Sequence, residues 1–238
     1  MELKHRVGEK NLETIPSDKT SHTVSDILGF NDKNNVSISA SKYHCVTQNP
    51  FSLQIGLDGK IHRWKTPNKV RFAAFAGGYP TSDQALYAAS MLNKAATEWN
   101  GLKLGVDFEW VSKLEDAAFV LAYGGDEGST LARAFFPNSN DLNVVYVYQK
   151  AFEPGNVNYM KNIFLHELGH VLGLRHEFAP EKEGGTMQLG PRDPKSVMSY
   201  TFPPEIQAND VESTQKFYSL TETQCWPELI TALPRHSL

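Results

Sequence analysis

The chain alternates between short β-favouring apolar runs and longer stretches in which apolar residues recur at helical spacing. Residues 69–75 (KVRFAAF) predict a strand that ends at a glycine pair. Apolar residues three and four apart over residues 85–99 then predict a helix. Thr81 and Gln84 form a capping-box pattern at its start, and Asn100-Gly101 is a stop signal. Further strands are predicted at residues 104–111, 117–123 and 143–148.

A second helix is predicted between residues 158 and 172 by apolar positions that share one face. Asn156 or Asn158 is placed to cap its start, and Gly173 is placed to end it. A loop rich in glycine and proline follows over about 177–206, and a last helix is expected over about 208–219. The order strand, helix, several strands, helix, loop, helix is typical of an α+β fold.

Composition narrows the class of protein. The 238 residues are 40% hydrophobic and 21% charged, which excludes a wholly disordered, collagen-like or coiled-coil chain. No run approaches the ~18 apolar residues of a membrane span. The net charge is −4 and the basic residues are scattered, so nucleic acid is not an expected partner. Residues 1–60 are polar and weakly patterned, so we expect an N-terminal extension there and one domain over 61–238.

The candidate chemistry lies in the second helix, which carries the sequence HELGH. Residues four apart leave the same helical face, so His166 and His170 present two imidazoles suited to one zinc ion. Glu167 can reach a water on that ion without being a ligand. Gly173 allows the chain to turn back, through φ > 0, so that His176 becomes the third ligand. Three protein ligands leave one coordination position open, as in catalytic zinc sites.

The alternative is that these histidines are ordinary helix and loop residues. The chain has eight histidines, and three of them fall between His166 and His176. The complete pattern HExxHxxGxxH is expected by chance in only about 10⁻⁵ to 10⁻⁴ of chains with this composition. The metal site is therefore the preferred interpretation.

With this motif the sequence resembles the metzincin clan of zinc peptidases. Ser196-Val197-Met198-Ser199-Tyr200 follows the third histidine and resembles the clan's Met-turn, in which a methionine lies beneath the three histidines. The alternative for Met198 is a plain core methionine. The resemblance implies a twisted mixed sheet, two long helices and a C-terminal helix. It also implies an active-site cleft between an upper and a lower subdomain.

Two residues make the resemblance closest to the astacin type. Tyr200, two residues after Met198, is then expected to be a fifth zinc ligand that can move away and stabilise the transition state. The alternative is a tyrosine in the wall of the site that never contacts the metal. Glu177, directly after His176, is then expected in a buried ion pair, with a trimmed N-terminus as one candidate partner. Its alternative is a surface glutamate.

Residues 130–137 (TLARAFFP) resemble the edge strand of matrix metalloproteinases. Arg133 stands where that family has a histidine for a second, structural zinc, so a single catalytic zinc ion is expected here. Asp126, Glu127 and Asp141 suggest calcium, but a solvated acidic loop is the preferred interpretation.

These features predict a zinc-dependent endopeptidase, a hydrolase that cuts peptide bonds with a metal-activated water. Glu167 acts as general base, and Tyr200 assists at the oxyanion. An extended protein or peptide substrate is expected along the edge strand, with a side-chain pocket walled by residues 186–204. The alternative is a catalytically silent, zinc-containing module that binds peptides, which the intact Glu167 disfavours. We expect a monomer.

The N-terminal region leaves several alternatives open. It has no apolar signal-peptide core, whereas the family resemblance favours secretion, so the compartment is left undetermined. Residues 1–60 are a candidate inhibitory prosegment, with Cys45 or Asp58 as the group that blocks zinc. The alternatives for Cys45 are a disulfide with Cys225 or a free thiol, with Cys225 also free. The alternative for Asp58 is a residue of a simple turn.

Overall fold

A computed structural model describes residues 14–17, 62–140, 142–179 and 188–221. Cys45, Cys225, Asp58, Asp141 and most of the extension over 1–60 lie outside the described residues, so the predictions made for them stay predictions. Within the described part of the chain, no helix is both long enough and apolar enough to cross a membrane.

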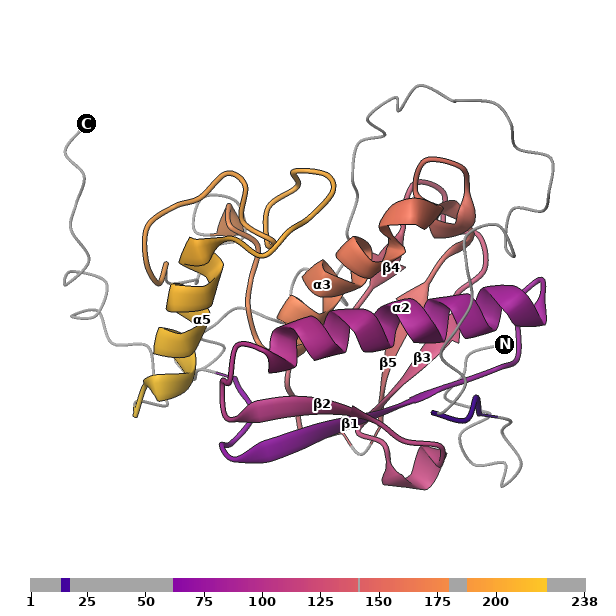
Figure 1. The fold of residues 1–238 in the computed structure, drawn as a ribbon, viewed down its shortest axis with the longest axis horizontal. Helices are drawn as coiled ribbons and strands as arrows, with labels where there is room; N and C mark the ends of the chain where they lie inside the picture. Colours follow the sequence, from indigo (N-terminus) through magenta and orange to yellow (C-terminus); the bar gives the residue numbers. More distant parts are fainter. Residues whose placement is uncertain (1–13, 18–61, 141, 180–187, 222–238) are drawn as a thin grey trace.

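The centre of the fold is a five-stranded mixed sheet with the order β2-β1-β3-β5-β4 (Figure 1). Its first four strands are parallel, and β4 pairs antiparallel with β5 at one edge. The strands are β1 (Asn68–Ala74), β2 (Val106–Trp110), β3 (Phe119–Tyr123), β4 (Ala132–Arg133) and β5 (Asn143–Val147). The predicted strands are confirmed, and β4 is shorter than the segment 130–137 that suggested an edge strand.

Three α-helices accompany this sheet: α2 (Ser82–Asn100), α3 (Met160–Val171) and α5 (Ala208–Ser219). Figure 1 shows α2 lying across the sheet with α3 beside it, and α5 near the C-terminal end of α3. The predicted α+β fold, with a mixed sheet, two long helices and a C-terminal helix, is confirmed. The predicted division into two subdomains stays a prediction.

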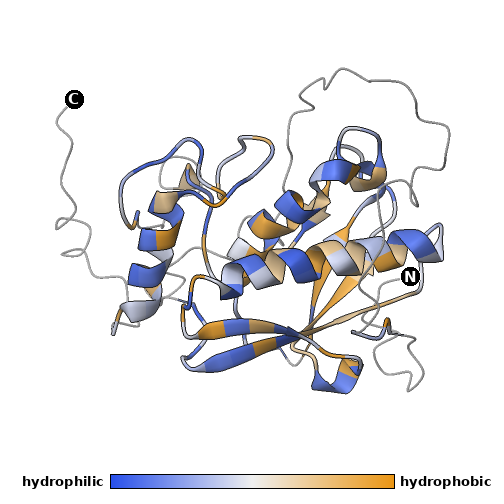
Figure 2. Ribbon diagram, viewed as in Figure 1, coloured by the Kyte–Doolittle hydropathy of each residue, from blue (hydrophilic) through white to orange (hydrophobic). Residues whose placement is uncertain are grey.

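The main core lies between the sheet and the two long helices. Alternation in β1 directs Val70, Phe72 and Ala74 into it, and alanines on the buried face of α2 allow close packing. The buried Trp99 indole of α2 donates to the Leu165 carbonyl of α3 over 2.9 Å. Figure 2 shows the central strands β3 and β5 as mainly apolar, whereas apolar and polar residues alternate along the helices. This packing holds α3 against α2.

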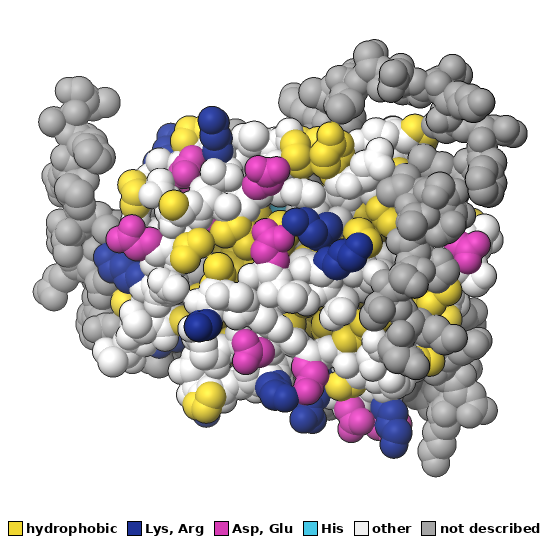
Figure 3. Space-filling view, viewed as in Figure 1, with side chains coloured by type: hydrophobic (Ala, Val, Ile, Leu, Met, Phe, Trp, Pro, Cys, Tyr) yellow, Lys and Arg dark blue, Asp and Glu magenta, His cyan; other side chains and the backbone are white. Residues whose placement is uncertain are grey.

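The surface carries charges of both signs. On the face shown in Figure 3, Lys and Arg side chains are interspersed with Asp and Glu, and apolar side chains are visible between them. On β1 and β2, Lys69 and Arg71 both form exposed ion pairs with Glu109. Solvent screens such exposed pairs, so they contribute little and the buried core dominates stability.

One end of a helix differs from the sequence prediction. Thr81 caps α2 as expected, since its hydroxyl accepts from the Gln84 amide over 3.2 Å. The prediction that Asn156 or Asn158 caps α3 is wrong, because α3 begins at Met160 without a side-chain cap. A 3₁₀ turn, η5 (Val157–Tyr159), leads into α3 instead, and the Asn156 side chain donates to the Lys150 carbonyl over 2.9 Å.

A short N-terminal segment packs on the domain. Thr14 forms an antiparallel bridge with Phe75, and the Ile15 amide donates to the Ala74 carbonyl over 2.8 Å. The Ile15 side chain is only 4% exposed and joins the main core. Part of the predicted extension therefore contributes to the folded domain.

Ile15→Ala is expected to lower the free energy of unfolding by about 3 kcal/mol, because it removes a buried branched side chain. Ile15→Val should cost only about 1 kcal/mol. Urea unfolding of the full chain measures both values. Equal stability of wild type and Ile15→Ala would contradict the anchoring role of this segment.

Candidate metal centre

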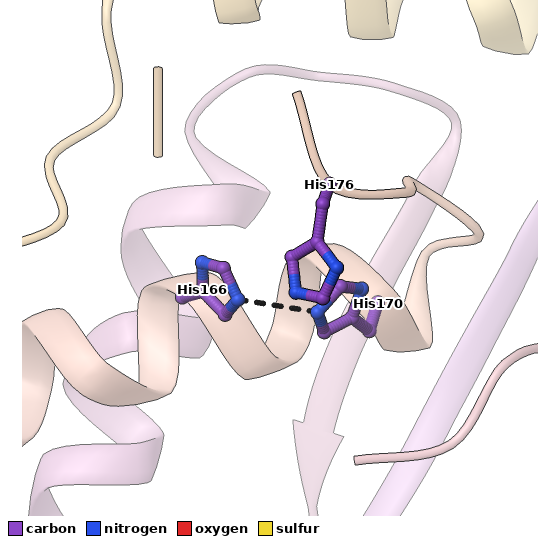
Figure 4. Close-up of side chains that lie close together, drawn as sticks. All are labelled: His166, His170 and His176. Carbon is purple, nitrogen blue, oxygen red and sulfur yellow. Dashed lines mark hydrogen bonds between the residues drawn. The ribbon is translucent and has the colours of Figure 1, made fainter. Parts of the chain in front are cut away.

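Helix α3 presents two histidines to the same point. His166 and His170 lie one helical turn apart, and both are fully buried. Their Nε2 atoms lie 3.2 Å apart (dashed line in Figure 4). Two nitrogens bound tetrahedrally to zinc at 2.0–2.1 Å would lie about 3.4 Å apart. The observed spacing therefore fits two ligands of one zinc ion.

The third histidine arrives from the loop after α3. Gly173 has φ of +100°, which reverses the chain, and the Leu174 amide donates to the Gly169 carbonyl over 2.9 Å. Figure 4 shows the His176 ring reaching from this loop toward the two helical rings. One ligand atom from each histidine lies within 4.8 Å of the others. Within the described residues, this is the one group of candidate metal ligands that comes together.

Backbone carbonyls orient the two helical imidazoles. Nδ1 of His166 lies 2.7 Å from the Val197 carbonyl, and Nδ1 of His170 lies 2.8 Å from the Leu174 carbonyl. A carbonyl accepts, so in the neutral rings the proton is on Nδ1 and a lone pair is on Nε2. Two adjacent lone pairs cannot hydrogen-bond to each other, whereas a shared cation satisfies both. The donor set therefore fits zinc.

Burial keeps these rings neutral. Removal from water, with repulsion from His176, lowers the pKa of His166 to about 3. The same causes hold the pKa of His170 well below its usual value. Metal ligation requires the neutral imidazole, so both rings are in the form that binds zinc.

The segment around Met198 supports α3 from one side. Met198 is 4% exposed, and a Cβ at Gly169 would lie 2.4 Å from its sulfur, so glycine lets the methionine side chain pack directly against α3. The Asp210 carboxylate of α5 accepts from the Ser196 hydroxyl (2.6 Å) and the Val197 amide (2.8 Å). Because Val197 also accepts from His166, Asp210 indirectly orients a candidate ligand.

Aromatic rings surround the third histidine. Phe178 stacks on His176 with ring centroids 4.9 Å apart and an interplanar angle of 10°. Tyr200 contacts the same ring edge-on at 5.1 Å and is 39% exposed. Phe136, which follows β4, contacts His170 at 5.2 Å. The position of Tyr200 suits either a wall residue or a ligand, so both predictions for it stand.

The two glutamates of the motif lie in different surroundings. Glu167 is fully buried in α3 beside His166. Glu177 is part-buried, and its carboxylate accepts from the Asp193 amide over 2.6 Å. Burial raises the pKa of Glu177, and the nearby Asp210 adds to this effect. Glu177 is therefore no ordinary surface glutamate, and its predicted pairing with an N-terminus concerns residues that the structure does not describe.

The edge-strand residues make local contacts. Arg133 pairs with Glu127 over 3.4 Å and lies over the Tyr148 ring. Asp126 accepts from the Gly128 amide within its own loop. These contacts agree with the preferred interpretation of residues 126 and 127 as a solvated loop.

A cavity of about 110 Å³ lies beside the metal site. The loop predicted to wall a pocket contributes residues 188–198, and α5 forms another wall. Apolar and acidic side chains line it together with His176, among them Leu174, Glu177, Met198, Asp210 and Phe217.

Several residues at this centre had no signal in the sequence. Phe136, Phe178 and Asp210 were not singled out as site residues. Phe136 and Phe178 contact His170 and His176, whereas Asp210 reaches His166 only through Val197, and all of these placements arise from tertiary packing. The Val197 and Leu174 carbonyls are backbone groups, which no sequence pattern singles out.

This fold and its three-histidine centre define a zinc metallopeptidase. The chain belongs to the dual-action HEIGH metallo-peptidase family, whose model matches residues 53–181, more than half of the chain. The family motif HEIGH appears here as HELGH, with leucine at position 168. One zinc ion is the expected cofactor, and the three histidines form a group able to hold it.

Comparison with the curated proteins finds no match. Among solved structures, high choriolytic enzyme 1, a hatching-enzyme zinc protease from the medaka fish Oryzias latipes, is similar at 13% identity with a TM-score of 0.45. That match covers 66% of this chain and 94% of the fish enzyme.

Proposed function

We propose that this metallopeptidase is an endopeptidase with His166, His170 and His176 as zinc ligands and Glu167 as general base. The observation that carries the proposal is the convergence of three buried imidazoles within 4.8 Å. Three such ligands leave a coordination position for water. Bound zinc would supply a Lewis acid that lowers the pKa of water and polarises the scissile carbonyl.

Two side chains of the protein, Glu167 and Tyr200, are proposed to carry out the proton transfer and to stabilise the oxyanion. The Glu167 carboxylate accepts a proton from the attacking water and delivers it to the leaving amine nitrogen. The Tyr200 hydroxyl donates to the oxyanion that develops on the carbonyl. The proximity of Tyr200 to His176 supports this role.

The substrate is proposed to bind in extended conformation along β4. This strand is last in the sheet order and pairs with β5 on its inner side. Phe136, just beyond β4, contacts His170, so this edge leads to the metal centre. Hydrogen bonds to a strand edge use only backbone groups, which favours a broad range of protein substrates.

Metal removal tests the proposal. Purified full chain with zinc is expected to cut denatured casein into internal fragments, detected by mass spectrometry. A chelator should reduce cleavage to background, and added zinc should restore it. Intact casein in the presence of a fully zinc-loaded protein would instead favour the peptide-binding module.

A further inference from the structure

The C-terminal end of α3 has an unusual set of hydrogen-bond donors. The last carbonyls of a helix lack partners within the helix and must be satisfied from elsewhere. The Leu174 amide reaches the Gly169 carbonyl, and the Gly173 amide reaches the His170 carbonyl over 2.8 Å. Both bonds come from the turn itself and are typical of a glycine-terminated helix.

The next two carbonyls receive donors from distant parts of the chain. The Trp64 indole donates to the Val171 carbonyl over 2.7 Å, across 107 positions in the sequence. The Tyr218 hydroxyl of α5 donates to the Leu172 carbonyl over 2.8 Å. Every carbonyl from Gly169 to Leu172 therefore has a donor.

Trp64 and Tyr218 lie close together at this turn. Tyr218 is only 7% exposed, and this burial raises its pKa, which the Trp64 backbone lowers in part. The hydroxyl therefore keeps its proton and can donate to Leu172. The neighbouring Arg63 donates to the Phe217 carbonyl over 3.0 Å, which ties the segment before β1 to α5.

The turn held by these donors carries two parts of the metal centre. The Leu174 carbonyl orients His170, and His176 follows two residues later. The His62 carbonyl lies against Gly173, where an added Cβ would approach it to 2.6 Å. A shift of the turn would therefore displace one imidazole and rotate another.

We infer that Trp64 and Tyr218 are positioning residues of the metal centre, which hold the end of α3 so that His170 and His176 meet His166 at one ion. The inference rests on the proposed set of zinc ligands. Neither side chain is proposed to touch metal or substrate.

The test compares three conservative variants of the full chain. Tyr218→Phe removes one hydroxyl, and Trp64→Phe removes the indole donor. Tyr87→Phe is the matched control, because the Tyr87 hydroxyl is buried and donates to the Val157 carbonyl over 2.8 Å, before the start of α3. Chelator competition measures zinc affinity, thermal unfolding of the apoprotein measures stability, and the absorption spectrum of the cobalt-substituted protein reports ligand geometry.

Tyr218→Phe and Trp64→Phe are expected to raise the zinc dissociation constant about tenfold and to alter the cobalt spectrum. Tyr87→Phe should lower apoprotein stability similarly but change zinc affinity less than about twofold. Zinc affinity and cobalt spectra of Tyr218→Phe and Trp64→Phe that match the control would overturn the inference. Wild type that binds no zinc would overturn the ligand assignment itself, so the two failures are distinguishable.

Discussion

Glu167→Gln is expected to remove about 10²–10⁴-fold of kcat for peptide cleavage while zinc stays bound. Glutamine has nearly the same shape but cannot accept the proton of the attacking water. Glu167 is not a member of the three-histidine group, and backbone carbonyls of Val197 and Leu174 orient the helical imidazoles, so we expect the ligands to stay in place. Turnover of a fluorogenic peptide and elemental analysis for zinc measure the two quantities separately.

Glu98→Gln provides a matched control. Glu98 is partly exposed and pairs with Lys161 of α3 over 2.8 Å, so its loss perturbs the same helix without affecting the proposed base. Its kcat should remain near the wild-type value. Unchanged turnover in Glu167→Gln would show that another group accepts the proton.

Gly173→Ala is expected to destabilise the protein by about 3 kcal/mol or more and to weaken zinc binding. Gly173 has φ of +100°, a conformation that costs other residues free energy. The new Cβ would also lie 2.6 Å from the His62 carbonyl, a backbone atom that cannot rotate away. Urea unfolding of the apoprotein and zinc titration measure the two effects.

Gly155→Ala is a control that separates the cost of the positive φ at Gly173 from the cost of the Cβ contact with the His62 carbonyl. Gly155 has φ of +89°, but an added Cβ would meet nothing within 4 Å. Strain alone should cost this variant about 1 kcal/mol, with zinc affinity preserved. Equal losses in both variants would mean that the approach of His62 to Gly173 contributes nothing.

Local signals were sufficient for much of the secondary structure. The predicted helix over 208–219 agrees with α5, and Thr81 and Asn100-Gly101 correctly marked the ends of α2. Caps and stop signals act within one helical turn, so the sequence around them carries the information. The start of α3 was predicted wrongly because a 3₁₀ turn replaces a side-chain cap there.

The neighbours and register of the strands could not be predicted from local sequence signals. The apolar runs indicated strands, but the parallel pairing of β1 with β2 depends on the crossover through α2. The edge strand β4 is only two residues long, because just Ala132 and Arg133 pair with β5. The burial of Ile15 was likewise invisible, since the segment around it has no periodic pattern.

The sequence by itself determined the chemistry of the centre. Helical geometry places residues four apart on one face, so the HELGH motif alone puts two imidazoles together, with a carboxylate on the residue next to the first. Only the tertiary structure decided where the third imidazole lies and how the rings are turned. Val197, Trp64 and Tyr218 contribute from segments far from α3, and their contacts exist only after the sheet and α5 have packed. Side-chain type and helical spacing are local properties of a chain, whereas the orientation of a ligand depends on everything packed around it.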